Sequence, residues 1–240
     1  MSIDVEIWSD IACPWCYIGK RRFERALEEF PHKADVNVSW RSYQLDPTLP
    51  DHDERSEKEY LSAAKGIPAD QVEGMLGHVT QQARDEGLHY DFDSLVVANS
   101  RRAHRVLQAA KQADRADGGN RTDALKEALL EGHFVSGHNI GDEDVLVELG
   151  VAAGLTQEQV RDAVGSEELD TAVDRDISEG MQLGVRGVPF FVFGNKYGVS
   201  GAQPPEVFAQ ALETIWNESQ TSPLITLDSS DGEACGPEGC

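Results

Sequence analysis

The hydrophobic and polar positions near the N-terminus predict a strand, a helix and a second strand. Residues 5–10 and residues 36–43 show strand-like patterns, whereas the apolar positions within residues 17–30 recur at helical spacing. Those helical positions are Ile18, Phe23, Ala26, Leu27 and Phe30. Because two strands joined by one helix pair in parallel, we expect a βαβ unit at this end of the chain.

The middle of the chain, from about residue 56 to residue 183, is almost wholly helical in pattern and shows no internal repeat. Capping boxes begin at Ser56 and at Thr156. An amphipathic pattern predicts one helix over residues 94–116. Further helices are expected at residues 122–134, 143–153, 156–164 and 167–183.

Strand character returns in residues 188–193, and residues 196–200 can pair back through a turn at residues 194–195. A last helix is expected from the paired prolines at residues 204–205 to about residue 217. The layout predicts an α/β protein with a thioredoxin-like sheet, into which a large all-helical domain is inserted. We expect the two halves of the thioredoxin-like domain at residues 1–45 and 185–218, the helical insertion at residues 46–184 and a flexible tail at residues 219–240.

Composition excludes several classes of function. The formal net charge of the 240 residues is −22, so nucleic acid and anionic membranes are poor partners. The N-terminus has no basic region and no apolar signal core, so we expect a cytoplasmic protein unless a precursor segment was removed. The histidines show no metal-ligand spacing, and His133 and His138 are expected at surface or capping positions.

The candidate chemistry lies at Cys13-Pro14-Trp15-Cys16, between the first strand and the first helix. A thiol at a helix N-terminus has a lowered pKa, so we expect Cys13 to be the more exposed, acidic and attacking thiol. Cys16, one turn later, is expected to be more enclosed and to resolve the mixed disulfide. Pro14 suits the first helical position, and Trp15 adds bulk without charge. The alternatives are a static disulfide and part of a zinc site.

Two further positions bear on this pair. Pro189 follows Val188 at the head of an apolar strand, where a cis peptide bond resolves the conflict between proline and strand pairing. The backbone of Val188 would then be free to pair with a substrate peptide beside Cys13. Asp10 can take up a proton during exchange, raise the thiol pKa by charge repulsion, or cap the helix.

The stretches SDIACPWCYIGK at residues 9–20, GVPFFV at residues 187–192 and VSGAQ at residues 199–203 together resemble the DsbA-like thiol oxidoreductases, most closely their FrnE-like branch. The resemblance covers essentially the whole chain. It implies a thioredoxin fold with a helical insertion, Cys13 and Cys16 as the redox pair, and Pro189 as a cis proline facing them. Pro14, Trp15 and Val188 are the expected substrate contacts.

The main hypothesis is therefore a cytoplasmic thiol–disulfide oxidoreductase that needs neither cofactor nor metal. Its expected substrates are disulfide-containing or thiol proteins, with glutathione or a thioredoxin-type protein as possible reductant. One rival is a glutathione-dependent isomerase or transferase of the 2-hydroxychromene-2-carboxylate isomerase or kappa-class type, with Arg101, Arg102 and His104 facing a small-molecule cleft. Another is a redox-gated holdase.

Two more cysteines, Cys235 and Cys240, stand at the C-terminal end and are separated by four residues. Such a pair can close a disulfide if the segment doubles back. The resemblance to the FrnE-like branch extends to this ending. We expect a second dithiol that exchanges with Cys13–Cys16, against the alternatives of an inert disulfide, a metal-scavenging pair and a zinc site that pools all four cysteines.

Overall fold

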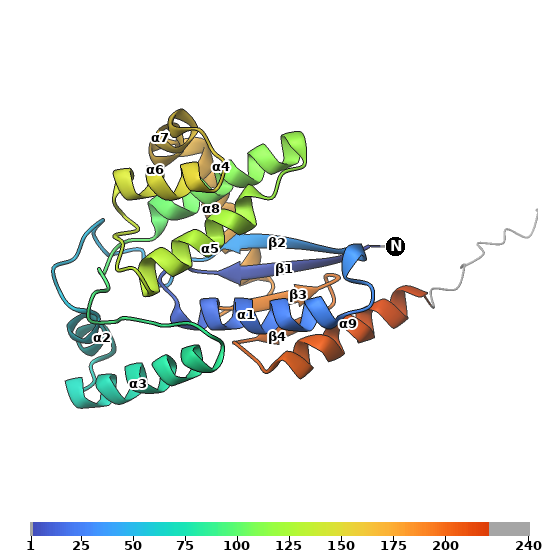
Figure 1. The fold of residues 1–240 in the computed structure, drawn as a ribbon, viewed down its shortest axis with the longest axis horizontal. Coiled ribbons are helices and arrows are strands. Elements are labelled where there is room, and N and C mark those ends of the chain that lie inside the picture. Colours follow the sequence, from blue (N-terminus) through green and yellow to red (C-terminus); the bar gives the residue numbers. More distant parts are fainter. Residues whose placement is uncertain (1, 221–240) are drawn as a thin grey trace, which may run out of the picture.

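The computed structural model describes residues 2–220 and is built on one mixed sheet (Figure 1). Its strands are β1 (Ile3–Ser9), β2 (Val36–Ser42), β3 (Phe190–Phe193) and β4 (Tyr197–Ser200), in the order β2-β1-β3-β4. β1 pairs in parallel with β2 and antiparallel with β3, and β4 returns as a hairpin partner of β3. The mixed α/β fold and the parallel first pair are as predicted from the sequence.

Helices cover the sheet and fill the segment between β2 and β3. α1 (Pro14–Glu29) and α9 (Pro205–Gln220) lie along one face, and a short 3₁₀ helix, η1 (Lys33–Asp35), leads into β2 (Figure 1). The inserted helices are α2 (Glu57–Lys65), α3 (Ala69–Asp85), α4 (Arg101–Asp117), α5 (Arg121–Phe134), α6 (Glu143–Ala152), α7 (Gln157–Gly165) and α8 (Glu167–Gln182). None of these elements is long and apolar enough to cross a membrane.

The face of the sheet beneath α1 and α9 holds an aromatic core. Phe23 of α1 contacts Phe191 and Phe193 of β3 and Phe208 of α9, with ring centroids between 5.5 and 6.2 Å apart. Alternate residues of β1 complete this core, because successive side chains of a strand point to opposite faces. The core therefore joins the two ends of the chain into one layer.

The helical insertion has its own core and begins its helices as the capping signals predict. The side chains of Ser56 and Thr156 accept hydrogen bonds from the backbone N–H groups three residues later, and both capping boxes are complete. α4 lies at the centre of the insertion and packs against α5, α7 and α8. Satisfying backbone groups at the first turn in this way fixes where each helix starts.

Two boundaries differ from the sequence prediction. Residues 94–100 are not helical, although their apolar residues are buried. Asn99 explains the difference: its N–H donates to the carbonyl of Pro50, and its side-chain amide donates to the carbonyls of Pro47 and Leu49. These tertiary hydrogen bonds replace the helical ones, so α4 begins at Arg101. The last helix extends to Gln220, into the range expected for the tail.

The insertion is tied to the sheet through the buried Asp176 of α8. Its backbone carbonyl accepts a hydrogen bond from the indole of Trp8 in β1 at 2.7 Å. Its carboxylate accepts from Arg41 at 2.8 Å, from the Ser42 N–H at 2.9 Å and from Gln108 at 2.6 Å. One residue thus connects two strands with two inserted helices.

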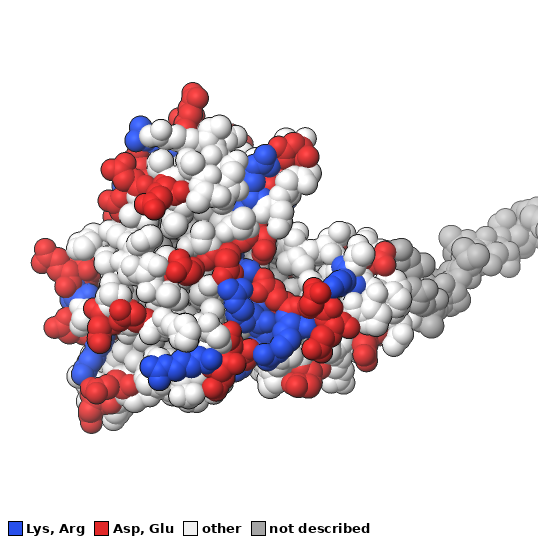
Figure 2. Space-filling model, in the orientation of Figure 1, with Lys and Arg blue, Asp and Glu red and all other residues white. Residues whose placement is uncertain are grey.

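The charged surface is mixed despite the strong net negative charge. Basic side chains gather over α1 and are bordered by acidic ones (Figure 2). Arg22 and Arg25 of this group pair with Glu86 at the end of α3, and Arg21 pairs with Glu127 of α5. Because these cations are neutralised locally, the group joins α1 to the insertion and offers no free surface to anionic partners.

A substitution at Gly180 tests how closely α8 packs on the sheet. A Cβ added at Gly180 would lie 2.6 Å from Nε1 and 2.8 Å from Cδ1 of Trp8, so the Trp8–Asp176 hydrogen bond would have to shift. We predict that Gly180→Ala lowers the free energy of unfolding by about 1–3 kcal/mol, the usual cost of overpacking. Urea denaturation followed by circular dichroism measures it. Gly77→Ala, in the open middle of α3, is the control and should be neutral or stabilising by up to about 1 kcal/mol; equal effects of the two substitutions would contradict the prediction.

Candidate active site

The two cysteines lie at the turn between β1 and α1, as predicted. Cys13 is the N-cap residue of α1, Pro14 occupies the first turn, and the Cys16 N–H donates to the Cys13 carbonyl at 3.0 Å. Both cysteines are free thiols; Cys13 is 4 % exposed and Cys16 is 1 % exposed. The structure therefore describes a reduced pair whose first member is the nearer to solvent.

Val188 and Pro189 face this pair from the start of β3. Their peptide bond is cis, which confirms the prediction for Pro189. The Cys13 sulfur lies 3.4 Å from the Val188 carbonyl oxygen. Pro189 packs so closely on α1 that a Cβ at Gly19 would lie 2.9 Å from its Cγ. The two halves of the thioredoxin-like domain thus meet at the sulfur of Cys13.

The surroundings of the two thiols act on their pKa values in opposite directions. A hydrogen bond to Cys16, reinforced by burial, raises the pKa of Cys13 well above its ordinary value. Burial alone would also raise the pKa of Cys16, but the hydrogen bond from Cys13 and the charge of Lys126 lower it. The expectation that Cys13 is the more acidic thiol is therefore wrong: the helix N-terminus is outweighed by partners that favour a thiolate on Cys16.

Lys126 of α5 is a site residue that the sequence reasoning missed. It is 1 % exposed, and burial lowers its pKa to about 8. Lys20 is equally buried but pairs with Glu24 and Glu127, whereas no carboxylate within residues 2–220 forms an ion pair with Lys126. Its ammonium instead lies 5.4 Å from the ring centroid of Trp40 and interacts electrostatically with both thiols.

Two observations support an orientation in which the Lys126 side chain extends toward the two cysteines. Cys16 and Lys20 share one face of α1, because they are four residues apart, and Lys20 contacts α5 through Glu127. A buried cation without a carboxylate partner is costly unless another anion is near. The sequence could have indicated that Lys126 is buried, because it lies on the same helical face as Leu130 and His133, which are also buried.

Asp10 is buried, precedes the cysteine pair in the sequence and has three polar partners. Its carboxylate accepts hydrogen bonds from the Ala12 N–H at 3.3 Å and the Leu45 N–H at 2.7 Å, and lies 3.1 Å from Nε2 of His104. Burial would raise the pKa of Asp10, but these hydrogen bonds lower it. Asp10 does not cap α1; as an anion it contributes to the raised pKa of Cys13.

A cavity of about 540 Å³ opens beside Cys13, between the thioredoxin-like core and α2 and α3. Its lining includes Pro14, Trp15 and Val188, the three expected substrate contacts, but not Cys16. Trp15 also packs on His78 of α3, with ring centroids 5.9 Å apart. His133 lines the cavity as a buried residue, so the expectation of a surface or capping role is wrong.

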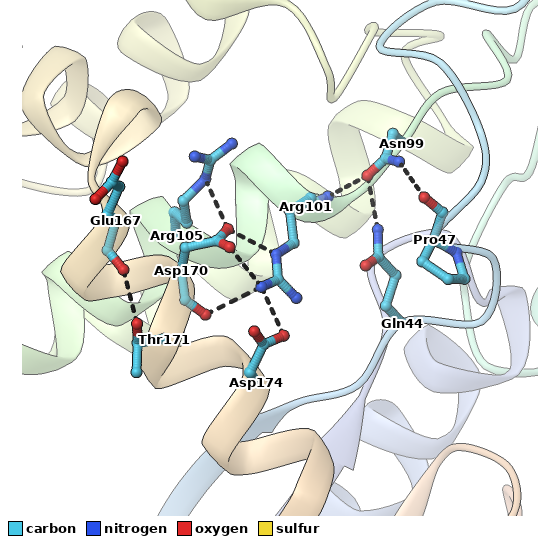
Figure 3. A pocket seen from close by; sticks show the side chains of 9 residues that line it. All are labelled: Gln44, Pro47, Asn99, Arg101, Arg105, Glu167, Asp170, Thr171 and Asp174. Atoms are coloured by element: carbon cyan, nitrogen blue, oxygen red, sulfur yellow. Dashed lines mark hydrogen bonds and ion pairs between the residues drawn. The ribbon is translucent and has the colours of Figure 1, made fainter.

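The three residues considered for a small-molecule cleft do not converge. Arg101 lines an open hollow of about 570 Å³, where its guanidinium is bound by Asp170 and Asp174 of α8 (Figure 3). Arg102 pairs with Asp51, and His104 is buried against Asp10. Arg101 and Arg102 therefore act mainly in internal ion pairs, which weakens the case for them as ligand-binding residues.

The remaining candidates concern metals and the second dithiol. Within residues 2–220, no three His, Cys, Asp or Glu side chains are grouped so that they could hold a metal ion. Cys235 and Cys240 lie outside the described residues. Their proposed exchange with Cys13–Cys16 stays a prediction.

Comparison with known proteins gives consistent matches along the chain. A family model described as a DSBA-like thioredoxin domain matches residues 4–213. The crystal structure of a probable DsbA oxidoreductase from Streptomyces coelicolor is 42% identical and has a TM-score of 0.85, covering 99% of this chain and 98% of that one. An uncharacterised protein of Bacillus subtilis, YwbO, is 23% identical, covering 88% of this chain and 96% of its own.

A more distant structure shares the fold. The cytosolic disulfide reductase DsbM of Pseudomonas aeruginosa is 20% identical, with a TM-score of 0.63, and the match covers 90% of this chain and 99% of that one. A second structure of that protein contains GSH.

The buried ammonium leads to a prediction for thiol ionisation. Lys126→Met keeps the bulk of the side chain and removes the charge that favours a thiolate on Cys16. We expect the first thiol titration of the reduced protein to move up by about one pH unit, equivalent to about 1.4 kcal/mol. Thiolate absorbance at 240 nm as a function of pH measures it.

Lys111→Met provides the matched control. Lys111 is also largely buried, but it binds the Trp40 carbonyl and lies near Asp176. This substitution should leave the thiol titration unchanged. A shift of the same size in both variants, or in neither, would show that Lys126 does not act on the pair.

Proposed function

Since the chain belongs to the DSBA-like thioredoxin domain family, we propose that it is a cytoplasmic protein thiol–disulfide oxidoreductase of the FrnE-like branch that works through Cys13 and Cys16. The observation that carries the proposal is the placement of Cys13. Its sulfur lies at the wall of a cavity and against the Val188 carbonyl, while Cys16 is enclosed behind it. This arrangement exposes one thiol to a substrate and reserves the other for resolution.

The proposed exchange uses a proton that passes between the Cys13 and Cys16 thiols. The Cys13 sulfur attacks one sulfur of a substrate disulfide as its proton passes to the adjacent Cys16, and the other substrate sulfur leaves as a thiolate. Cys16 then gives up this proton to the leaving thiolate and attacks the Cys13 sulfur of the mixed disulfide. The products are an oxidised Cys13–Cys16 pair and a substrate with one thiol and one thiolate, which takes up a proton from water. Lys126 stabilises Cys16 when it carries the negative charge.

The backbone beside Cys13 supports a polypeptide substrate. Val188 is half-buried, lines the cavity and precedes the buried Pro189. An extended peptide can pair with its backbone groups, which aligns a substrate cysteine with Cys13. Pro14 and Trp15 then form the opposite side of the contact.

We propose that electron flow favours reduction. Related pairs span about −270 to −120 mV, and Trp15 adds no charge that would stabilise the thiolate of Cys13. The distant relative DsbM is a cytosolic disulfide reductase, and its structure with GSH supports glutathione as a reductant, beside a thioredoxin-type protein. Redox titration of Cys13–Cys16 against glutathione measures the direction.

The two rival functions differ from dithiol exchange because neither of them needs Cys16. A glutathione-dependent isomerase or transferase uses one activated thiol, and in those enzymes a serine typically stands at the position of Cys13. Here the second thiol is buried directly behind the first, which favours dithiol exchange. Glutathione-dependent turnover that survives Cys16→Ser would support the isomerase, and client protection without either thiol would support a holdase.

Insulin reduction tests the proposal. The wild-type protein with dithiothreitol should accelerate insulin precipitation, and Cys13→Ser should reduce the rate to that of dithiothreitol alone because no attacking thiol remains. Cys16→Ser should instead accumulate a mixed disulfide with insulin, visible by non-reducing electrophoresis and mapped to Cys13 by mass spectrometry. Equal turnover by wild type and Cys13→Ser would refute the proposal.

The C-terminal pair belongs to the same proposal as a relay. Trp216 of α9 contacts Phe30, just beyond the end of α1. α9 therefore ends near the end of α1 that is remote from Cys13, about 24 Å away for a helix of this length. Fourteen residues lie between Gln220 and Cys235, and the fifteen residue-to-residue steps span at most about 50 Å. Chain length thus permits exchange within one molecule or between two.

Removal of the C-terminal pair tests the relay. Truncation before Cys235 should leave the reaction with dithiothreitol unchanged and slow turnover with a protein reductant at least fivefold. In a Cys16→Ser protein, a disulfide from Cys13 to Cys235 or Cys240 should be detectable by mass spectrometry. The relay is wrong if no such linkage forms and truncation leaves both reactions unchanged.

A further inference from the structure

The cavity beside Cys13 has walls that are mainly aliphatic. They come from the segment after β2, from α2 and α3 and from the segment before α4, and include Leu45, Leu49, Leu61, Met75, Leu76 and Val97. A volume of about 540 Å³ exceeds what one amino-acid side chain fills, so a residue next to a substrate cysteine can enter it together with part of its backbone. Aliphatic walls favour a side chain with a long apolar stem.

The polar groups in these walls include hydrogen-bond acceptors, beside the donors Tyr60, Lys65 and Ser100. His133 is 3 % exposed, burial lowers its pKa to about 4, and its Nδ1 has no hydrogen-bond partner within residues 2–220. A hydrogen bond with the backbone of His138 acts in the opposite direction and raises the pKa of His133. Its Nδ1 atom is itself buried, so it is not directly open to the cavity.

Carboxylates add to this acceptor character. Asp46 and Glu57 line the cavity, and the Asp46 carboxylate is fixed by the hydroxyl of Tyr60 at 2.9 Å. Burial raises the pKa of Glu57 to about 7, so it is substantially ionised at slightly alkaline pH. Lys65, an exposed residue of α2, is the one cation in the lining as the structure describes it.

We propose that this cavity binds a lysine or arginine side chain adjacent to the substrate cysteine, and so selects basic polypeptide segments over acidic ones. The inference rests on the proposed function, because it assigns the substrate of the same Cys13. A basic side chain matches both properties of the walls: its methylene stem packs on the aliphatic residues, and its N–H groups meet Glu57 and Asp46. A carboxylate in the same place would lose its hydration and face like charges.

Three peptides that differ only in the residue after a single cysteine test the selection. That residue is Lys, Leu or Glu, and each peptide is supplied as its mixed disulfide with 2-thiopyridine. Reduced protein that carries Cys235→Ser and Cys240→Ser, so that only Cys13 and Cys16 can release thiopyridone, is mixed with each peptide in a stopped-flow instrument in 0.3 M salt, and the release is followed at 343 nm. Each rate is divided by the rate of the same peptide with 2-mercaptoethanol. We expect the Lys peptide to react at least tenfold faster than the Glu peptide, with the Leu peptide between them.

Matched variants separate the cavity from the overall negative charge. Glu57→Gln should reduce the Lys-to-Glu ratio at least threefold, whereas Glu54→Gln changes the net charge equally outside the cavity and should leave the ratio unchanged. Ala64→Trp places a large ring in the cavity and should slow the Lys and Leu peptides. Ala63→Trp, on the same helix but outside the lining, should not.

The outcomes distinguish failure of the cavity assignment from failure of the oxidoreductase proposal. If Cys13 reacts with neutral dipyridyl disulfide but the three peptides exchange at one rate, the cavity does not select and the oxidoreductase proposal stands. If Glu57→Gln and Glu54→Gln lower the ratio equally, the preference comes from net charge and the cavity assignment is wrong. If neither dipyridyl disulfide nor any peptide reacts, the oxidoreductase proposal itself fails.

Discussion

Helix α1 is the element on which the arrangement of the site depends. One face packs through Phe23 and Ala26 on the sheet, and a second face meets α5 through Lys20. Its N-terminal end holds Cys13 against the Val188 carbonyl, and Gly19 lets Pro189 approach the helix closely. The site is therefore positioned by three parts of the chain that are remote in sequence, and a shift of α1 would disturb all of them together.

The insertion contributes to the chemistry as well as to the shape of the site. Lys126 and His133 come from α5, and His104 of α4 binds the buried Asp10. Thiol ionisation in this protein is thus governed by side chains that a bare thioredoxin-like domain lacks. In a dithiol pair, a charge that stabilises the reduced thiolate also makes the disulfide a stronger oxidant. Substitutions in α5 are therefore a route to altering direction without touching either cysteine.

The sequence predicted the features that depend on local signals. The strand–CxxC–helix order, the two capping boxes, the hairpin and the cis bond before Pro189 follow from spacing, propensity and a recognisable motif. The predictions that failed concern features that depend on partners far along the chain. Residues 94–100 lose their helix to hydrogen bonds made by Asn99, and the pKa of Cys16 is lowered in part by the charge of Lys126 on α5.

Asp176 and Trp8 make the insertion and the sheet one cooperative unit. The hydrogen bond from the Trp8 indole to the Asp176 backbone carbonyl is buried, and Arg41, Ser42 and Gln108 bind the Asp176 carboxylate. Undocking α8 would leave several of these groups without partners in an apolar setting, which costs more than either part gains by remaining folded alone. The two parts should therefore unfold in a single transition. The indole of Trp8, at the seam, is an intrinsic fluorophore whose emission reports whether they are docked.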